Sequence, residues 1–274
     1  MLSMGLQVRF VEVKAAARPT QVVVLGVLTN YLLIPAIAVG LCVAFQADPM
    51  TSAGILVLAI CPGAPVGPLF TSLARGNMPL AVSMMVILAV FSAILSPALL
   101  SLLLTRIAPD SNLHIDFLAI VKTLMLAQML PLAAGLAIHE WAPRLTKRLC
   151  KPLELLANLL LLVLIALILA TEYETLAVIR LRGWFGMSLL FMASLGTGWL
   201  FGGPNATDRK AMAVTTSSRN AAVGLAIVTS NFAGTPAVTA VVAYGLLSIV
   251  GTLICALLIG RFNVCDPSDK PVGL

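Results

Sequence analysis

Charged and aromatic residues are scarce in this sequence, at 10% and 6% of 274 residues, whereas hydrophobic residues make up 60%. A soluble domain needs more charged surface than this, so the composition excludes the soluble globular class and is typical of helical membrane proteins. Cysteine is also scarce, and its five residues have neither paired nor metal-ligand spacing. A disulfide framework and a zinc site are therefore not expected.

Catalytic motifs and a leader sequence are missing as well. The apolar segments contain no Ser-His-Asp set, no His-Glu metal motif and no paired carboxylates, so we do not expect an enzyme. Residues 1–10 have no basic n-region and no small-residue cleavage site, which excludes a signal peptide. These residues are too few to cross a membrane, and we expect them to be the end of a helix whose beginning is missing.

Long hydrophobic runs, in contrast, fill the chain. Most approach the roughly 20 residues that a helix needs to cross the hydrocarbon core. We therefore expect an all-α integral membrane protein with eight full spans and an N-terminal partial helix. The expected spans are residues 22–45, 51–73, 79–104, 115–138, 153–170, 184–201, 211–229 and 236–259.

The basic residues are distributed unevenly between the two faces that these spans define. Of 17 Lys and Arg, 12 fall on one face, two lie inside spans, and only Arg106, Arg180 and Arg182 fall on the other face. Because the face richer in Lys and Arg is normally cytoplasmic, residues 261–274 are predicted to be a cytoplasmic tail. The same bias accounts for the net charge of +6 without a nucleic-acid partner, and the lipid bilayer is the expected environment.

The apolar run at residues 51–73 is interrupted by a proline-rich segment, residues 61–68 (CPGAPVGP). Its three prolines remove three amide donors and disturb the carbonyl groups one turn earlier. A single proline would indicate a kink in a packed helix. Three prolines beside Gly63 and Gly67 favour an unwound segment that lines a cavity.

The run at residues 211–229 is interrupted by six polar residues, 215–220 (TTSSRN). An arginine near the middle of a bilayer costs roughly 2.5–3.5 kcal/mol on insertion scales and normally faces a cavity or a partner. The expected spans hold almost no carboxylate, so a bound organic anion is favoured as the partner of Arg219 over a structural ion pair. The candidate substrate-binding residues are Arg219, Asn220, Ser217, Ser218, Thr216, Thr215, Pro62, Gly63, Gly67, Thr71 and Asn30.

Two short matches indicate an internal repeat. Residues 76–82 (GNMPLAV) resemble residues 233–238 (AGTPAV), and the same offset of 157, which is 236 minus 79, aligns the Val-Gly pair at 66 with the pair at 223. The loop assignment gives the two units opposite orientations, an arrangement from which many alternating-access carriers are built. We therefore expect one transmembrane domain over 1–274, with a first, N-terminally truncated repeat at 1–106 and a second at 115–260. The two broken helices should cross near the bilayer midplane.

Three motifs together resemble the bile acid:sodium symporter family: residues 61–63 (CPG), residues 73–77 (LARGN), and the block from 219–220 (RN) to 231–236 (NFAGTP). The resemblance runs from residue 4 to the last span. It implies ten helices in two inverted five-helix repeats, with the fourth and ninth helices broken and crossing at the substrate and sodium sites. The chain would then begin partway through the second helix, and a bacterial inner (cell) membrane is the expected location.

The resemblance fails at positions that bind sodium in the family. A Ser-Asn pair is replaced by Gly67 and Pro68, a glutamate aligns with Thr215, and a glutamine aligns with Arg219, whereas Asn30 is kept in kind. A hard cation prefers several oxygen ligands, usually including a carboxylate, and a fixed positive charge repels it. Asn30 and Thr215 remain only as weak sodium candidates. We therefore expect a secondary transporter of an organic anion with weak or no sodium coupling.

Two alternatives stay open at this point. The first is sodium symport of a bile-acid-like substrate. The second is a pseudocarrier that does not transport, in which Arg219 locks two helices together. No cofactor is expected, and sodium stays open as a coupling ion.

Overall fold

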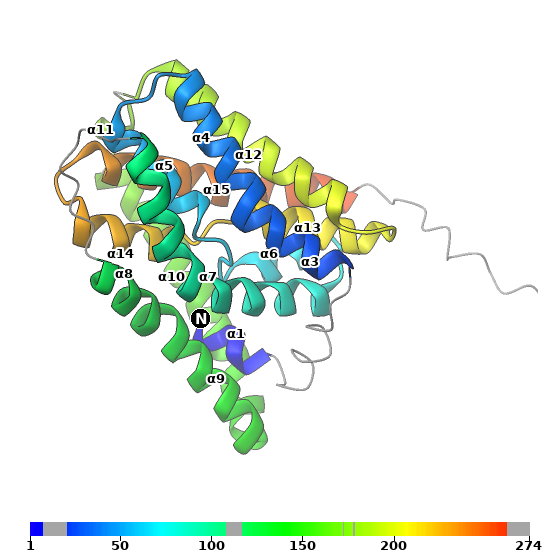
Figure 1. Cartoon of the computed structure of the whole chain (residues 1–274). Coiled ribbons are helices and arrows are strands. Elements are labelled where there is room, and N and C mark those ends of the chain that lie inside the picture. The colour runs from blue at the N-terminus through cyan, green and yellow to red at the C-terminus, as the bar shows by residue number, and fades with distance from the viewer. Residues whose placement is uncertain (8–20, 108–116, 172, 178, 262–274) are drawn as a thin grey trace, which may run out of the picture.

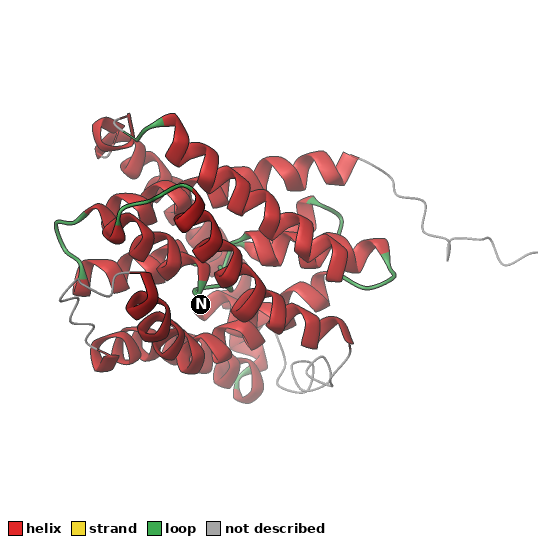
Figure 2. Cartoon of the chain, turned by 45° about the horizontal axis from the view of Figure 1, so that its top comes forward, coloured by secondary structure: helices red, strands yellow, loops and turns green. Residues whose placement is uncertain are grey.

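Helices make up the regular structure of this chain. The computed structural model describes residues 1–7, 21–107, 117–171, 173–177 and 179–261, and apart from one isolated bridge all regular structure in these ranges is helical (Figure 2). The all-α prediction is confirmed for this part of the chain.

The helices follow one another through short connections, and two π-helical turns, η1 and η2, continue without a break into the helices beside them (Figure 1). The elements are α1 (Leu2–Gln7), α3 (Gln21–Leu28), η1 (Thr29–Leu33), α4 (Ile34–Ala44), α5 (Pro49–Ala59), α6 (Gly67–Leu73), α7 (Met78–Ile107), α8 (Phe117–Leu124), η2 (Met125–Met129), α9 (Leu130–Trp141), α10 (Pro143–Thr171), α11 (Tyr173–Ala177), α12 (Leu181–Phe201), α13 (Ala206–Ser217), α14 (Ala221–Asn231) and α15 (Pro236–Arg261).

Five helical segments of the described chain are long and apolar enough to cross a membrane. They are Gln21–Ala44, Met78–Leu103, Ile120–Trp141, Leu181–Phe201 and Pro236–Arg261. An integral membrane protein is thus supported, but eight full spans are not confirmed.

Three of the expected spans account for the difference. The apolar runs at 51–73 and 211–229 are each divided into two short helices, and the run at 153–170 is part of the 29-residue α10, which is not among the five.

The two divided runs meet each other where their helices stop. The first break separates α5 from α6 and the second separates α13 from α14. Pro62 of the first break and Arg219 of the second form an isolated antiparallel bridge, and the backbone N–H of Asn220 donates to the carbonyl of Cys61 over 2.9 Å. Both segments are thus interrupted in the structure, and the two interruptions lie against each other.

Close packing against neighbouring helices fixes the positions of the short helices beside the two breaks. In α12, a Cβ added to Gly198 would lie 2.5 Å from the carbonyl oxygen of Met212 in α13, so only glycine permits this approach. Gly54 of α5 has the same role, because an added Cβ would overlap the carbonyl oxygen of Ala237 in α15. Small residues at helix contacts commonly allow such close packing in membranes. The half-helices of both breaks are therefore held against the long helices α12 and α15.

Candidate functional site

The first break leaves three consecutive carbonyl groups at the end of α5, and each receives a hydrogen bond. The carbonyl of Ala59 accepts from Nη1 of Arg219 over 3.0 Å, that of Ile60 accepts from the Ser96 hydroxyl, and that of Cys61 accepts from the N–H of Asn220. A carbonyl without a partner at membrane depth costs several kcal/mol. Two of the three donors come from the second break, so each break helps to satisfy the backbone of the other.

Arg219 is fully buried, with 1% of its side chain exposed, and its bonds go to neutral oxygens. Besides Ala59, the guanidinium donates to the Ser194 hydroxyl of α12 over 3.3 Å, while Nε has no partner. No carboxylate is buried in the described part of the chain. The cation also lies at the C-terminus of α5, which is the negative end of the helix dipole. Arg219 thus closes the break, and no buried carboxylate within the described ranges neutralises its charge.

Asn220 connects the second break to two other elements. Its Oδ1 caps α14 by accepting from the N–H of Val223 over 3.3 Å. Its Nδ2 donates to Oε1 of Gln128 in η2 over 3.4 Å. The residue therefore fixes the start of α14 and links it to the helix pair α8 and α9.

The hydroxyl groups of Thr215, Ser217 and Ser218 are engaged within α13. They donate to carbonyl oxygens one turn earlier, over 2.6, 3.2 and 2.8 Å. Serine and threonine commonly bond in this way inside helices. In this conformation the hydroxyls offer lone pairs rather than donors, which suits a cation better than an anion. Their role as anion-orienting groups stays a prediction.

Each π-helical turn contributes one buried carboxamide to the second break. Asn30 in η1 donates to the hydroxyl of Thr216 over 3.4 Å, and its Oδ1 has no partner. Gln128 in η2 donates to the carbonyl of Ala89 over 2.7 Å and accepts from Asn220. π-helical turns are rare and frequent at functional sites. Gln128 was missed at the sequence level, where its only signal was an amide side chain inside an apolar run.

A cavity of about 400 Å³ lies beside the breaks, and we name it the crossing cavity. It is bordered by α1, both breaks, α6, α10, α14 and α15. One carboxylate, Glu154 of α10, contributes to its wall. The lining residues are Met1, Ser3, Gln7, Ala64, Pro65, Val66, Pro68, Leu69, Glu154, Ala157, Leu160, Arg219, Asn220, Ala221, Ala222 and Ile249.

Of the eleven candidate residues from the sequence, only Arg219 and Asn220 line the crossing cavity. Pro62 is held in the bridge between the breaks, and Gly63 has a positive φ of 85° that favours glycine. Gly67 starts α6, and Thr71 is buried in that helix with no partner for its hydroxyl. The structure therefore gathers the candidates around one crossing without exposing most of them to the cavity.

Replacing Gln128 by methionine tests its position at the site. The variant keeps the side-chain length but loses the hydrogen bonds to Ala89 and Asn220. This loss should lower the free energy of unfolding by roughly 1 kcal/mol, and the unfolding temperature should therefore fall by about 2–4 °C. The start of α14 loses its anchor at the same time. Gln21→Met, the same change at an exposed position, is the matched control. An unfolding temperature equal to that of the control would show that these bonds do not stabilise the crossing.

The sequence model described as the Sodium Bile acid symporter family matches residues 1–179. Three curated relatives illustrate the similarity. The Oryza sativa subsp. japonica protein described as a probable sodium/metabolite cotransporter, BASS2, is 25% identical over 201 residues, which are 73% of this chain and 47% of the relative. The Bacillus subtilis protein described as an uncharacterized sodium-dependent transporter, YocS, is 24% identical over 245 residues, covering 87% and 74%. A Bos taurus protein described as a sodium-dependent organic anion transporter is 28% identical over 163 residues, covering 60% and 43%.

The chain thus spans about half the length of the rice relative and about three quarters of the Bacillus one. The matching family and these relatives are transporters, not enzymes.

Proposed function

Because the chain belongs to the sodium bile acid symporter family, we propose that it is a secondary transporter that moves an organic anion across the membrane by alternating access. The observation that carries the proposal is the crossing cavity, where two helix breaks meet beside Arg219 and Asn220. Broken helices that meet at midmembrane are typical of carrier substrate sites, because unwound backbone and half-helix N-termini can bind ions there. Asn220 at the N-terminus of α14 would contact the anion, and the buried charge of Arg219 would favour it electrostatically.

The inverted repeat belongs to the same proposal. The two bridged residues, Pro62 and Arg219, are separated by 157 positions (219 minus 62), which is the offset of the two sequence matches. Residues that correspond in the two units thus lie opposite each other at the crossing. This pairing supports two related units that rock against each other around a fixed site.

We further propose that sodium coupling is weak or absent. The described part of the chain has no buried carboxylate, and a fixed guanidinium occupies the carbonyl end of α5. A sodium ion nearby would be repelled by that charge and would lack the carboxylate ligand it usually has. The fixed cation would replace the charge that a bound ion supplies in a coupled carrier.

Sodium symport is the second candidate, and one observation favours it. Oδ1 of Asn30 is a buried acceptor without a partner, and it lies in the side chain that contacts Thr216. Together with the oxygen lone pairs of Thr215 it could serve as part of a sodium site. The printed descriptions of the relatives also name sodium.

Proteoliposomes separate the two candidates. We expect uptake of labelled taurocholate or a small 2-oxo acid to change less than about twofold when an inward sodium gradient is replaced by a potassium gradient. A steep sodium requirement would instead establish symport. If folded protein shows no saturable uptake with either gradient, the remaining hypothesis is favoured. In that hypothesis the protein is a pseudocarrier, and Arg219 only locks α5 to α13 and α12.

A further inference from the structure

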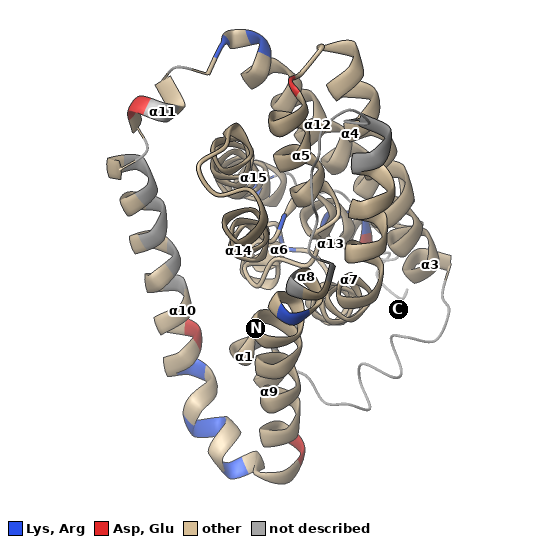
Figure 3. Cartoon of the chain, turned by 60° about the vertical axis from the view of Figure 1, so that its left-hand side comes forward, with Lys and Arg blue, Asp and Glu red and all other residues tan. Residues whose placement is uncertain are grey.

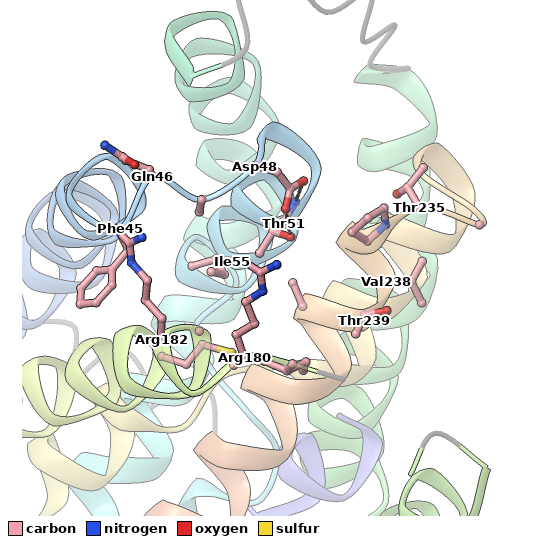
Figure 4. Close-up of a pocket in the computed structure, with 17 residues that line it drawn as sticks. Phe45, Gln46, Asp48, Thr51, Ile55, Arg180, Arg182, Thr235, Val238 and Thr239 are labelled. Atoms are coloured by element: carbon pink, nitrogen blue, oxygen red, sulfur yellow. Dashed lines mark hydrogen bonds between the residues drawn. The ribbon is translucent and has the colours of Figure 1, made fainter. Parts of the chain in front are cut away.

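A second, larger cavity lies at the far end of α5 from the breaks (Figure 4). Its volume is about 940 Å³, and it is formed by the connection between α4 and α5 together with the N-terminal parts of α5, α12 and α15. We name it the Arg180 cavity. Its residues do not overlap with those of the crossing cavity.

Two arginines supply positive charge to the Arg180 cavity. Arg180 and Arg182 flank the start of α12, and in Figure 4 both side chains extend toward α5 and the end of α4. The guanidinium of Arg182 lies 5.8 Å from the ring centre of Phe45, and neither arginine has an ion-pair partner in the described part of the chain. Figure 3 shows that basic residues are otherwise concentrated at the N-terminal end of α10.

One carboxylate lies in the same cavity, but its bonds are already committed. Asp48 caps α5 by accepting from the N–H groups of Met50 and Thr51, each over 3.0 Å, and from the Thr51 hydroxyl. Its charge therefore offsets the positive end of α5 rather than a guanidinium. The cavity keeps two uncommitted cations against one committed anion.

Three helix N-termini converge on this cavity, and the two that no carboxylate caps, those of α12 and α15, reinforce its positive potential. α5 begins at Pro49, α12 at Leu181 and α15 at Pro236, and residues at or beside each start line the wall. The N-terminus of a helix carries roughly half a positive elementary charge. Those of α12 and α15 have no acidic residue in the first turn. The α12 and α15 sides of the cavity, together with the two arginines, therefore favour a negative group.

The rest of the cavity fits an apolar body of moderate size. Ile55, Ile179, Met187 and Val238 provide an apolar surface, and the hydroxyl-bearing Thr239 lies among them. Small-molecule sites commonly have 300–1,000 Å³ and combine apolar walls with a few polar groups. The chemistry thus selects an amphipathic anion with a carboxylate, sulfonate or phosphate head.

The Arg180 cavity lies about one half-helix away from the point where the two breaks cross. α5 and α14 have 11 residues each and run from the breaks toward the Arg180 cavity, a distance of roughly 16 Å along either helix. That is about half the hydrocarbon thickness of a bilayer. We propose that the Arg180 cavity is a second binding site. It holds the head group of an amphipathic anion at the ends of α5 and α14 that lie away from the breaks. Its assignment to the transported anion rests on the proposed function, whereas anion binding itself does not.

Equilibrium binding of tritiated taurocholate to the full chain in lipid-free detergent tests this proposal. The measurement uses Ala157→Trp, which fills the crossing cavity at an exposed position of α10, as the background. We expect saturable binding in this background, and we expect Arg180→Gln with Arg182→Gln to weaken it at least about tenfold, because both charged donors are lost. Arg144→Gln with Arg148→Gln removes the same charge from exposed positions of α10 and should change the affinity less than twofold.

Each outcome decides the matter. No saturable binding in the Ala157→Trp background, or equal weakening by both double variants, overturns the second site, even if the wild-type protein transports. Binding that depends on Arg180 and Arg182 without any wild-type uptake supports the second site and rejects the proposed function. Taurocholate binding in nanodiscs identifies the natural source of the head group. Displacement of taurocholate by phosphatidylglycerol but not by phosphatidylcholine would indicate a lipid. Binding that neither lipid displaces would indicate a soluble anion.

Discussion

Replacing Arg219 by glutamine is expected to lower anion uptake about 100-fold, because the loss of a buried charged donor typically costs roughly 2–5 kcal/mol. Two effects act together. The carbonyl of Ala59 and the hydroxyl of Ser194 lose their charged donor, and a residue that lines the crossing cavity loses its positive charge. Uptake into proteoliposomes at equal amounts of folded protein measures the result.

Three variants separate the structural from the electrostatic part of this effect. Arg219→Lys keeps the charge but not the planar fork, so it should retain more uptake than the glutamine variant. Ser194→Ala removes one bond and no charge, and it should lower uptake less than about fivefold. Arg261→Gln, at the exposed end of α15, is the matched control for loss of charge. If Arg219→Gln, Arg219→Lys and Ser194→Ala lose uptake and thermal stability in parallel while Arg261→Gln does not, Arg219 is a lock and the anion binds elsewhere.

The same variant also probes the coupling ion. If Arg219 stands in for a bound cation, the residual uptake of Arg219→Gln should rise when sodium is added, since neutral oxygens at the break become free to bind it. Wild-type uptake should not respond in this way. A sodium response of equal size in both proteins would show that the guanidinium does not replace the ion.

The interrupted helices were predictable from the sequence, whereas most of the site geometry was not. Three prolines within seven residues cannot continue a helix, and a buried run of polar residues that includes Arg219 cannot remain in lipid without partners. Both features are local, so the positions of the breaks followed directly. The division of these runs into short helices also accounts for two of the three expected spans that are not among the five apolar helices long enough to cross a membrane.

Side-chain direction, in contrast, depends on tertiary contacts. The sequence placed Arg219 in an anion site, but its guanidinium turns toward the end of α5 because Ala59 and Ser194 lie there. The charges of Arg180 and Arg182 were interpreted only as loop charges that set orientation. Nothing in their spacing indicated that the starts of α5, α12 and α15 meet around them.

Replacing Asn220 by aspartate is expected to abolish uptake of an organic anion, by at least about 100-fold. Aspartate is as good an N-cap as asparagine, so the bond to the N–H of Val223 and the start of α14 should be preserved. Asn220 lines the crossing cavity, and two like charges about 4 Å apart repel by roughly 4 kcal/mol at an effective dielectric constant of 20. Proteoliposome uptake, compared with the unfolding temperature of the same preparation, measures the two effects separately.

Asn220→Ser is the control that distinguishes charge from shape. Serine also caps helices but carries no charge, so this variant should keep uptake within about tenfold of the wild type despite losing the bond to Gln128. Aspartate and serine variants with equal uptake would mean that no anion approaches α14, and the crossing cavity would then not be the substrate site. A folded aspartate variant without uptake, beside a transporting serine variant, would place the anion at the N-terminus of α14, because both variants cap α14 and lose the Asn220 amide donor to Gln128, whereas only aspartate adds a negative charge.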